Sequence, residues 1–223
     1  MKQGIAVQPA VTGSSMTVET VVRHIDRMIG KGNLKPGDTI SEPALIATLR
    51  IGRVPIREAI RILAGEGVLE LVPNRSARVR SVDATEILEM LDVLTGFTVT
   101  AIHLLSAKPL PPILAEEMLA WASKIQESAK AGRSGNELME EISLFHFILI
   151  KASGNQYLLR LLRKTRLNYY SRYLVALLGR RAFAEAAGSY GRMVNALIRG
   201  DPQAAIRILL RSVDRSKSHA KIE

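Results

Sequence analysis

Arginines at four-residue spacing are the side chains best placed to do chemistry with a partner: Arg53, Arg57 and Arg61. In a helix, residues four apart lie on one face. The opposite face of the same segment is apolar and carries Ile56, Ile60 and Leu63. A helix fits the major groove of B-DNA, and the planar guanidinium of arginine donates two hydrogen bonds to guanine O6 and N7. The spacing predicts a DNA-binding helix in which Arg53 and Arg57 contact bases and Arg61 contacts phosphate or solvent.

A second basic segment follows this helix. Residues 68–72 and 77–80 alternate apolar and polar side chains, which is typical of two strands, and residues 73–76 would join them in a hairpin. We expect this wing to contact the minor groove or phosphates through its tip and the basic residues beside it: Asn74, Arg75, Ser76, Arg78 and Arg80. A charged hairpin edge can equally protect against aggregation, so both interpretations of Arg78 and Arg80 stay open.

The elements around the arginines decide between DNA binding and a merely solvated helix face. An apolar stripe from Val18 to Ile29 predicts a first helix that Thr17 caps, and Ser41 before Pro43 predicts a short second helix. Three helices and a hairpin predict a winged helix-turn-helix over residues 16–82, after a flexible tail over residues 1–15. As the second helix of a tight helix-turn-helix, the arginine-bearing segment is expected to bind DNA.

Residues 83–219 carry helical periodicity almost throughout. Breaks at 109–112, 131–135, 153–154, around Gly179 and at 200–202 predict about six helices, each with one buried face. The fold class is therefore mainly α: a winged helix-turn-helix followed by an all-α bundle over residues 83–219.

Composition excludes several classes of protein. Of 223 residues, 47% are hydrophobic and 23% charged, as in a globular protein, and the net charge of +10 favours polyanionic partners. The absence of cysteine excludes disulfides, thiolate zinc sites, iron–sulfur clusters and a cysteine nucleophile. The opening residues lack an apolar signal segment, and the uncharged apolar stretch 93–107 is too short and too polar for a bilayer. We expect a cytoplasmic protein with no membrane partner.

Residues 17–80 resemble the DNA-binding domain of GntR-type bacterial transcription regulators. The resemblance rests on four motifs in order: Leu34-Lys35-Pro36-Gly37, the segment 53–60 (RVPIREAI), Glu66-Gly67-Val68 and Pro73-Asn74-Arg75. It implies that Arg53 and Arg57 read the major groove of an operator. This sequence departs from the family at three positions: Gly52 replaces a capping Ser or Thr, Ser76 replaces a wing glycine, and Pro43 replaces an arginine of some relatives.

The helical half is similar to the effector-binding domain called FCD. Its motifs here are Leu94-Thr95-Gly96, Phe145-His146 followed by 152–155 (ASGN), and 196–201 (ALIRGD). Many members hold a divalent metal with one Asp and three His, and a carboxylate effector binds that metal with help from an Arg. The matching ligand positions here are Ile142, His146, Tyr190 and Ser212, and the helper Arg falls on Leu91. Because one imidazole remains of four ligands, we expect no tightly bound metal and no cofactor.

Two interpretations of these positions stay open. Either His146, Tyr190 and Ser212 form a hydrogen-bonded network in a ligand-free core, or they anchor, beside Ile142, a pocket for a less acidic effector. Arg172 lies in a basic run, residues 160–181, that is either a solvated face or a contact for an anionic effector.

The sequence therefore predicts a sequence-specific transcription regulator and not an enzyme, since it lacks a nucleophile-elbow motif and a phosphate-binding glycine loop. We expect a homodimer on a near-palindromic operator in double-stranded DNA, acting as a repressor under control of a small-molecule effector. The alternative is an architectural DNA-binding protein whose helical domain only dimerises.

Overall fold

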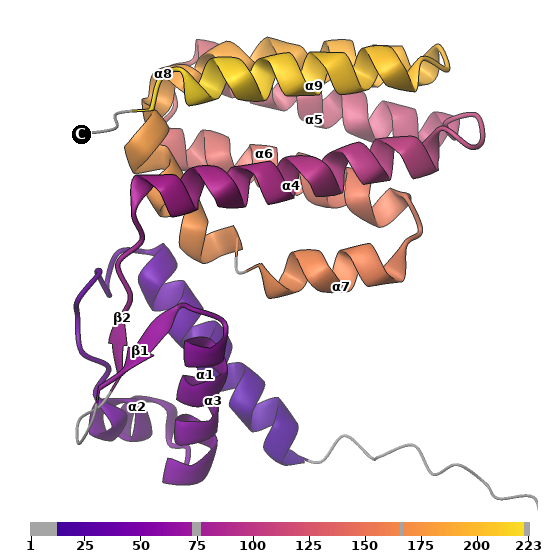
Figure 1. Cartoon of the computed structure of the whole chain (residues 1–223). Coiled ribbons are helices and arrows are strands. Elements are labelled where there is room, and N and C mark those ends of the chain that lie inside the picture. The colour runs from indigo at the N-terminus through magenta and orange to yellow at the C-terminus, as the bar shows by residue number, and fades with distance from the viewer. Residues whose placement is uncertain (1–12, 73–76, 166, 221–223) are drawn as a thin grey trace, which may run out of the picture. The chain divides into compact units, whose positions relative to one another are not determined.

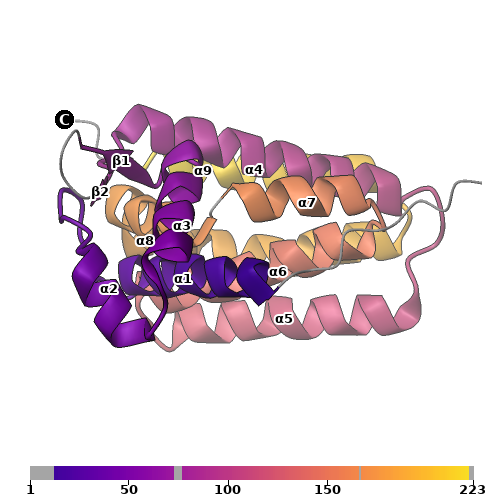
Figure 2. The ribbon, with the colours of Figure 1, turned by 90° about the horizontal axis from the view of Figure 1, so that it is seen from below.

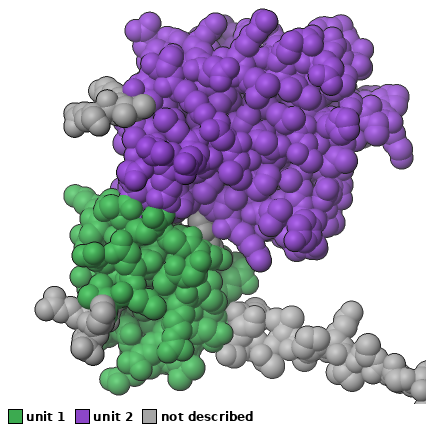
Figure 3. Space-filling model, in the orientation of Figure 1, with its two compact units in different colours: residues 1–81 green, residues 82–223 purple. Residues whose placement is uncertain are grey.

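The computed structural model describes residues 13–72, 77–165 and 167–220. Its internal contacts divide the chain into two compact units, residues 1–81 and 82–223 (Figure 3). The first unit contains three helices and a hairpin, and the second is helical, so the predicted fold class is confirmed.

The first unit is a winged helix-turn-helix (Figure 1). Its elements are α1 (Gly13–Gly30), α2 (Glu42–Leu49), α3 (Arg53–Gly65), β1 (Leu69–Leu71) and β2 (Ala77–Val79). Helix α1 packs against α3, and the apolar stripes predicted for both helices meet in the core. The buried residues of the two stripes are Val18, Val21, Val22, Ile25, Ile29, Ile56, Ala59, Ile60 and Leu63. This packing fixes α3 to the rest of the unit along its apolar side.

Local details of the first unit differ from the sequence-based expectation in two places. Helix α1 begins at Gly13, so Thr17 lies inside the helix and is not its cap. Residues 13–16 contain no proline, so the helix can continue upstream of Thr17. The hairpin also gains a third pairing: Ile40 N donates to Ala77 O at 2.7 Å, and Val79 N donates to Asp38 O at 2.9 Å. The predicted cap of α2 is confirmed, since Ser41 Oγ accepts from Ala44 N.

The second unit is a bundle of six helices among its described residues, with α4, α5 and α6 running lengthwise beside one another (Figures 1 and 2). They are α4 (Ala84–Leu105), α5 (Pro112–Lys130), α6 (Gly135–Ala152), α7 (Gln156–Lys164), α8 (Leu167–Ile198) and α9 (Pro202–Lys217). Asp83, Ser134, Asn155 and Asp201 cap four of them, each accepting from backbone N–H groups of the first turn.

The boundaries around α8 were predicted incompletely. The predicted break around Gly179 is confirmed as a kink within α8, where the glycine backbone is non-helical (φ 72°, ψ 164°). A further break, which the sequence did not predict, follows α7 at Thr165, whose Oγ1 donates to Leu162 O at 2.6 Å. Residues 164–166 contain neither glycine nor proline, which are the usual sequence signals of a helix end.

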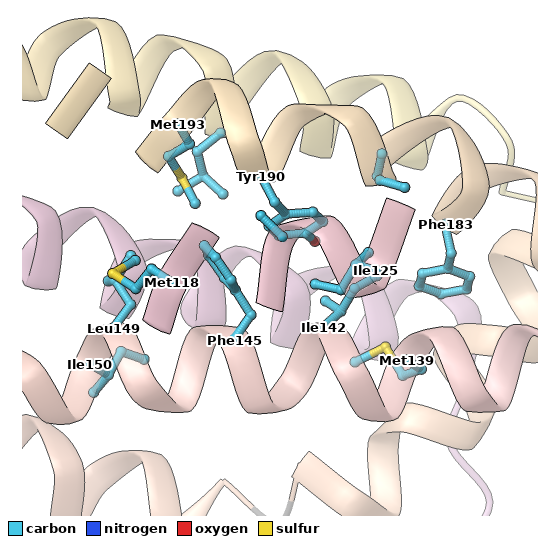
Figure 4. Close-up of a cluster of buried hydrophobic side chains, with 14 of the residues drawn as sticks. Met118, Ile125, Met139, Ile142, Phe145, Leu149, Ile150, Phe183, Tyr190 and Met193 are labelled. Carbon is cyan, nitrogen blue, oxygen red and sulfur yellow. The ribbon is translucent and has the colours of Figure 1, made fainter. Parts of the chain in front are cut away.

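Helix α6 is the centre of the bundle and contacts α4, α5, α7 and α8. Its Phe145 and Leu149 are fully buried beside Met118 of α5 and Met193 of α8 (Figure 4). His146 follows Phe145 in the sequence and is therefore carried into the bundle by a helix that is packed on several sides.

Candidate nucleic-acid interface and buried polar site

Helix α3 presents its arginines on the side opposite the core. Arg53, Arg57 and Arg61 are all exposed, whereas Ile56 and Leu63 are fully buried. Gly52 is the N-cap residue of α3. It has no side chain that could accept a hydrogen bond from the first backbone N–H groups of the helix. A rigid helix therefore carries one face of exposed guanidinium groups, as the spacing predicted.

Arg57 is held in place by a carboxylate that sequence reasoning missed. Its Nε donates to Glu42 Oε2 of α2 at 3.1 Å, and the Arg57 side chain stays 60% exposed. This bond uses only Nε of the guanidinium. The two terminal NH2 groups bond no residue that the structure describes, so they remain available to a ligand. Glu42 lies fifteen positions earlier, and only its place in the first turn of α2 hints at this contact.

The wing arginines are more constrained than predicted. Arg78 is exposed, but its Nε donates to Glu70 Oε2 of the paired strand at 2.8 Å. Arg80 is half-buried, and its Nε donates to Gly67 O at 2.6 Å, so it closes the turn between α3 and β1. The hairpin tip with Asn74, Arg75 and Ser76 lies outside the described residues.

A further basic residue, Arg50, lies in the turn of the helix-turn-helix. It has a left-handed backbone (φ 55°), and among the described residues it is the only non-glycine residue with positive φ. That conformation costs an ordinary residue about 1–2 kcal/mol. Its exposed side chain precedes α3 by three positions. The left-handed conformation itself could not have been foreseen from the sequence.

In the helical unit, His146 bonds a partner on α4. Its Nδ1 lies 3.1 Å from Thr98 Oγ1, and the same hydroxyl lies 3.1 Å from Leu94 O. Because a hydroxyl has a single proton, donation to the carbonyl of Leu94 makes Thr98 the acceptor from Nδ1–H. The neutral imidazole then offers Nε2 as an acceptor. Desolvation lowers the pKa of His146 to about 4, so the ring is neutral at physiological pH.

Tyr190 projects from α8 toward Phe145 and Ile142 of α6 (Figure 4). Its ring lies edge-on to Phe145 at 4.9 Å and to His146 at 5.7 Å between centroids. Burial raises the pKa of the phenol, which therefore stays protonated. Its hydroxyl has no hydrogen-bond partner within the part of the chain that the structure describes. His146 is half-buried, and its Nε2 also lacks such a partner there, so an acceptor and a donor without protein partners lie close together at the edge of the apolar core.

The remaining predicted effector residues lie in different surroundings. Ile142 is buried on α6 within the core. Ser212 of α9 lies 3.1 Å from Ser189 Oγ of α8, which is also 2.6 Å from Ala186 O. Since Ser189 donates to that carbonyl, Ser212 donates to Ser189. The His–Tyr–Ser network that the sequence left open is therefore not formed. Arg172 is half-buried on α8, and the Gly179 kink separates it from Tyr190 along the chain.

The four positions that correspond to metal ligands do not fit a divalent metal. Ile142 offers hydrocarbon, Tyr190 is a buried neutral phenol, and the Ser212 hydroxyl is bonded to Ser189. Only His146 provides a ligand atom of the type that such metals prefer.

A groove of about 400 Å³ lies elsewhere on the helical unit. It is lined by the α4–α5 connection, residues 105–110, and by the α8–α9 connection with Pro202. None of the predicted effector residues lines it, so it is separate from the buried polar site.

Family models match both units. The model described as "Bacterial regulatory proteins, gntR family" matches residues 17–79, and the FCD domain model matches residues 86–215. In structure, the chain is similar to McbR/YncC of E. coli, with a TM-score of 0.72 at 19% identity over 91% of this chain and 95% of that one. It is equally similar to a GntR transcriptional regulator of Rhodococcus sp. RHA1, with a TM-score of 0.72 at 20% identity over 92% and 97%.

In sequence, the chain is 30% identical to the HTH-type transcriptional regulator YdhC of Bacillus subtilis over 142 residues, 62% of each chain. It is 28% identical to the gluconate operon transcriptional repressor of Bacillus licheniformis over 67% of this chain and 58% of that one. The match spans about 60% of the length of these curated relatives. The protein belongs to the GntR family of bacterial transcription regulators and carries the FCD domain in its helical half.

Proposed function

We propose that this chain represses transcription by binding an operator sequence as a cytoplasmic homodimer, under the control of a small effector bound between α6 and α8. The observation that carries the DNA-binding part is the exposed arginine face of α3, with Arg57 held by Glu42. We infer repression rather than activation, because a protein that occupies a promoter is sufficient to block transcription. One relative, the gluconate operon transcriptional repressor of Bacillus licheniformis, is named as a repressor.

Base reading is assigned to the first half of α3. Arg53 and Arg57 lie in its first two turns, the part of a recognition helix that contacts base edges. The terminal NH2 groups of Arg57 can bond guanine O6 and N7 while Nε keeps its bond to Glu42. Arg50, Arg61 and Arg78 are assigned to phosphates, where they position the protein without reading sequence.

The effector follows from two side chains of α6 and α8, each of which has one polar atom without a protein partner among the described residues. Neutral His146 accepts at Nε2, and the Tyr190 phenol donates, so the complementary molecule carries one donor and one acceptor on an apolar body. The site lacks ligands for a metal on which a carboxylate would sit, so we infer an effector without net negative charge. Binding would favour one arrangement of the domains over another and so change operator affinity.

Selection from random double-stranded DNA with the full chain tests the DNA-binding part. We expect enrichment of a near-palindromic sequence with guanines in each half-site, and loss of that enrichment in Arg57→Ala. Enrichment of no sequence above the starting pool would contradict sequence-specific regulation.

Tyr190→Phe tests the effector part. Because the hydroxyl has no protein partner among the described residues, the variant should keep the melting temperature of the ligand-free chain or raise it. Native mass spectrometry of the purified protein should detect a co-purifying small molecule in the wild type and not in the variant. A marked loss of stability, without any bound molecule in either protein, would show that the phenol serves the core alone.

A further inference from the structure

Helix α4 is an unusual outer helix of the bundle. It is long and apolar enough to meet a length-and-composition test for a membrane span, yet only 28% of its most apolar 18-residue window is buried. It packs against α6, α7, α8 and α9, and its remaining side faces outward. Core helices of soluble proteins bury such windows, so the outward face of α4 needs a separate explanation.

The outward face is a single stripe along the helix. Its exposed residues recur at spacings of three and four: Thr85, Glu89, Asp92, Val93, Gly96, Thr100, His103 and Leu104. Val93 is 48% and Leu104 is 38% exposed, and half-buried Phe97 adjoins the stripe. Single exposed apolar residues are ordinary, but several on one uncharged stretch of a helix are typical of an interaction surface.

Gly96 lies at the middle of this stripe and has no reason within the chain to be glycine. Its backbone is helical, and an added Cβ would meet no atom within 4 Å. Glycine inside a helix costs about 1 kcal/mol relative to alanine. The absence of a side chain is explained if another backbone approaches closely at this point.

Two ionisable side chains on the stripe are equidistant from Gly96. Glu89 lies seven residues before it and His103 seven residues after it, which is about two turns in each direction and hence the same face. If two copies of α4 cross antiparallel at Gly96, Glu89 of each copy faces His103 of the other. Neither side chain has an ionic or hydrogen-bonding partner among the residues described. Asp92, the other acid on the stripe, already pairs with Lys217 of α9.

We propose that this face of α4 binds the same face of a second copy, antiparallel about a two-fold axis at Gly96. Such an isologous contact buries the apolar stripe, uses the open space at Gly96 and forms the Glu89–His103 pair twice. The inference rests on the proposed function, which requires a dimer, and adds the surface through which the dimer forms.

The test compares Gly96→Arg with Ala120→Arg in the full chain by analytical ultracentrifugation over a dilution series. Ala120 is an exposed residue of α5 and serves as the matched control. Gly96→Arg should keep the helical circular dichroism and melting temperature of the monomer fold, because nothing occupies the space beside it. We expect it to weaken dimerisation by at least about tenfold through steric exclusion, while Ala120→Arg leaves dimerisation unchanged.

A charge exchange tests the register. His103→Glu places two carboxylates opposite each other and should weaken the dimer, about tenfold at low salt, and Glu89→Arg added to it should restore the affinity. A dimer that Gly96→Arg does not weaken, or that the double exchange does not restore, overturns the α4 surface while leaving dimeric DNA binding intact. A wild-type chain that stays monomeric both free and on DNA overturns the surface and the proposed dimer together. Wild-type binding to phosphatidylglycerol vesicles that Gly96→Arg abolishes would assign the face to a membrane and also overturn the proposal.

Discussion

The DNA-binding unit and the helical unit place their functional groups in opposite environments. On α3 the arginines are exposed, and Ile56, Ala59 and Ile60 between them are buried in the core. In the helical unit, His146 and Tyr190 lie among apolar side chains, and desolvation lowers the pKa of one and raises that of the other. Substitution of an exposed arginine on α3 should therefore cost little folding stability. Substitution of His146 or Tyr190 should also alter the packing of the helical core.

The largest expected effect contrasts a core aromatic with an exposed arginine. Phe145→Ala removes a fully buried ring that contacts Tyr190 and should lower the unfolding free energy of the helical unit by about 3–5 kcal/mol. Arg61→Ala on the exposed face of α3 should change the unfolding free energy of its own unit by less than about 0.5 kcal/mol. Urea denaturation monitored by circular dichroism measures both. Equal losses of unfolding free energy in Phe145→Ala and Arg61→Ala would contradict the difference in burial between the two units.

Acid should destabilise the helical unit through His146. Its folded pKa of about 4 lies below the unfolded value of 6.5, so between these pH values the unfolded chain binds a proton that the folded chain does not. Stability is therefore unaffected above pH 6.5 and falls as the pH drops toward 4, by roughly 3 kcal/mol in total. Urea unfolding at several pH values measures the slope.

His146→Asn is the control for this slope, since an amide can still donate to Thr98 but does not titrate. The variant should lose most of the pH dependence between 6.5 and 4 whatever its absolute stability. An unchanged slope would show that His146 is not the group responsible.

Loss of a base-reading arginine should affect binding and not folding. Arg57→Ala should cost about 1–3 kcal/mol on the selected operator and relax the preference at one base position. Fluorescence anisotropy with operator and with single-base variants measures this. Equal weakening on operator and on random DNA would assign Arg57 to phosphate instead.

The smallest expected effect concerns the partner of that arginine. Glu42→Gln keeps the size of the side chain but removes the charge that holds Arg57 Nε. Random DNA should bind somewhat more tightly, because a carboxylate near the phosphates is gone, while the preference for operator should fall by about 1 kcal/mol. An operator preference equal to that of the wild type would show that the ion pair does not orient Arg57.

The same contrast explains how much could be predicted from the sequence. The winged helix-turn-helix and its exposed arginines follow from local signals: four-residue spacing, Ser41 before Pro43, and alternation in the strands. The contacts that matter inside the bundle come from distant segments. Thr98 lies forty-eight positions from His146, and no period in the sequence joins them. Two further contacts could not be predicted because they also join distant segments: the ion pair of Glu42 with Arg57, and the pairing of residues 38–40 with β2. The break at Thr165 carries no local sequence signal.

The central claim is that α3 reads bases through the fork of Arg57, and Arg57→Lys tests it most directly. Lysine keeps the charge but loses the planar pair of donors. Competition titrations at one fixed salt concentration should show that the wild type prefers the selected operator over a scrambled duplex. Arg57→Lys should keep its affinity for the scrambled duplex and lose most of the preference for the operator. A variant as selective as the wild type, or a wild type with no preference to lose, would contradict the account.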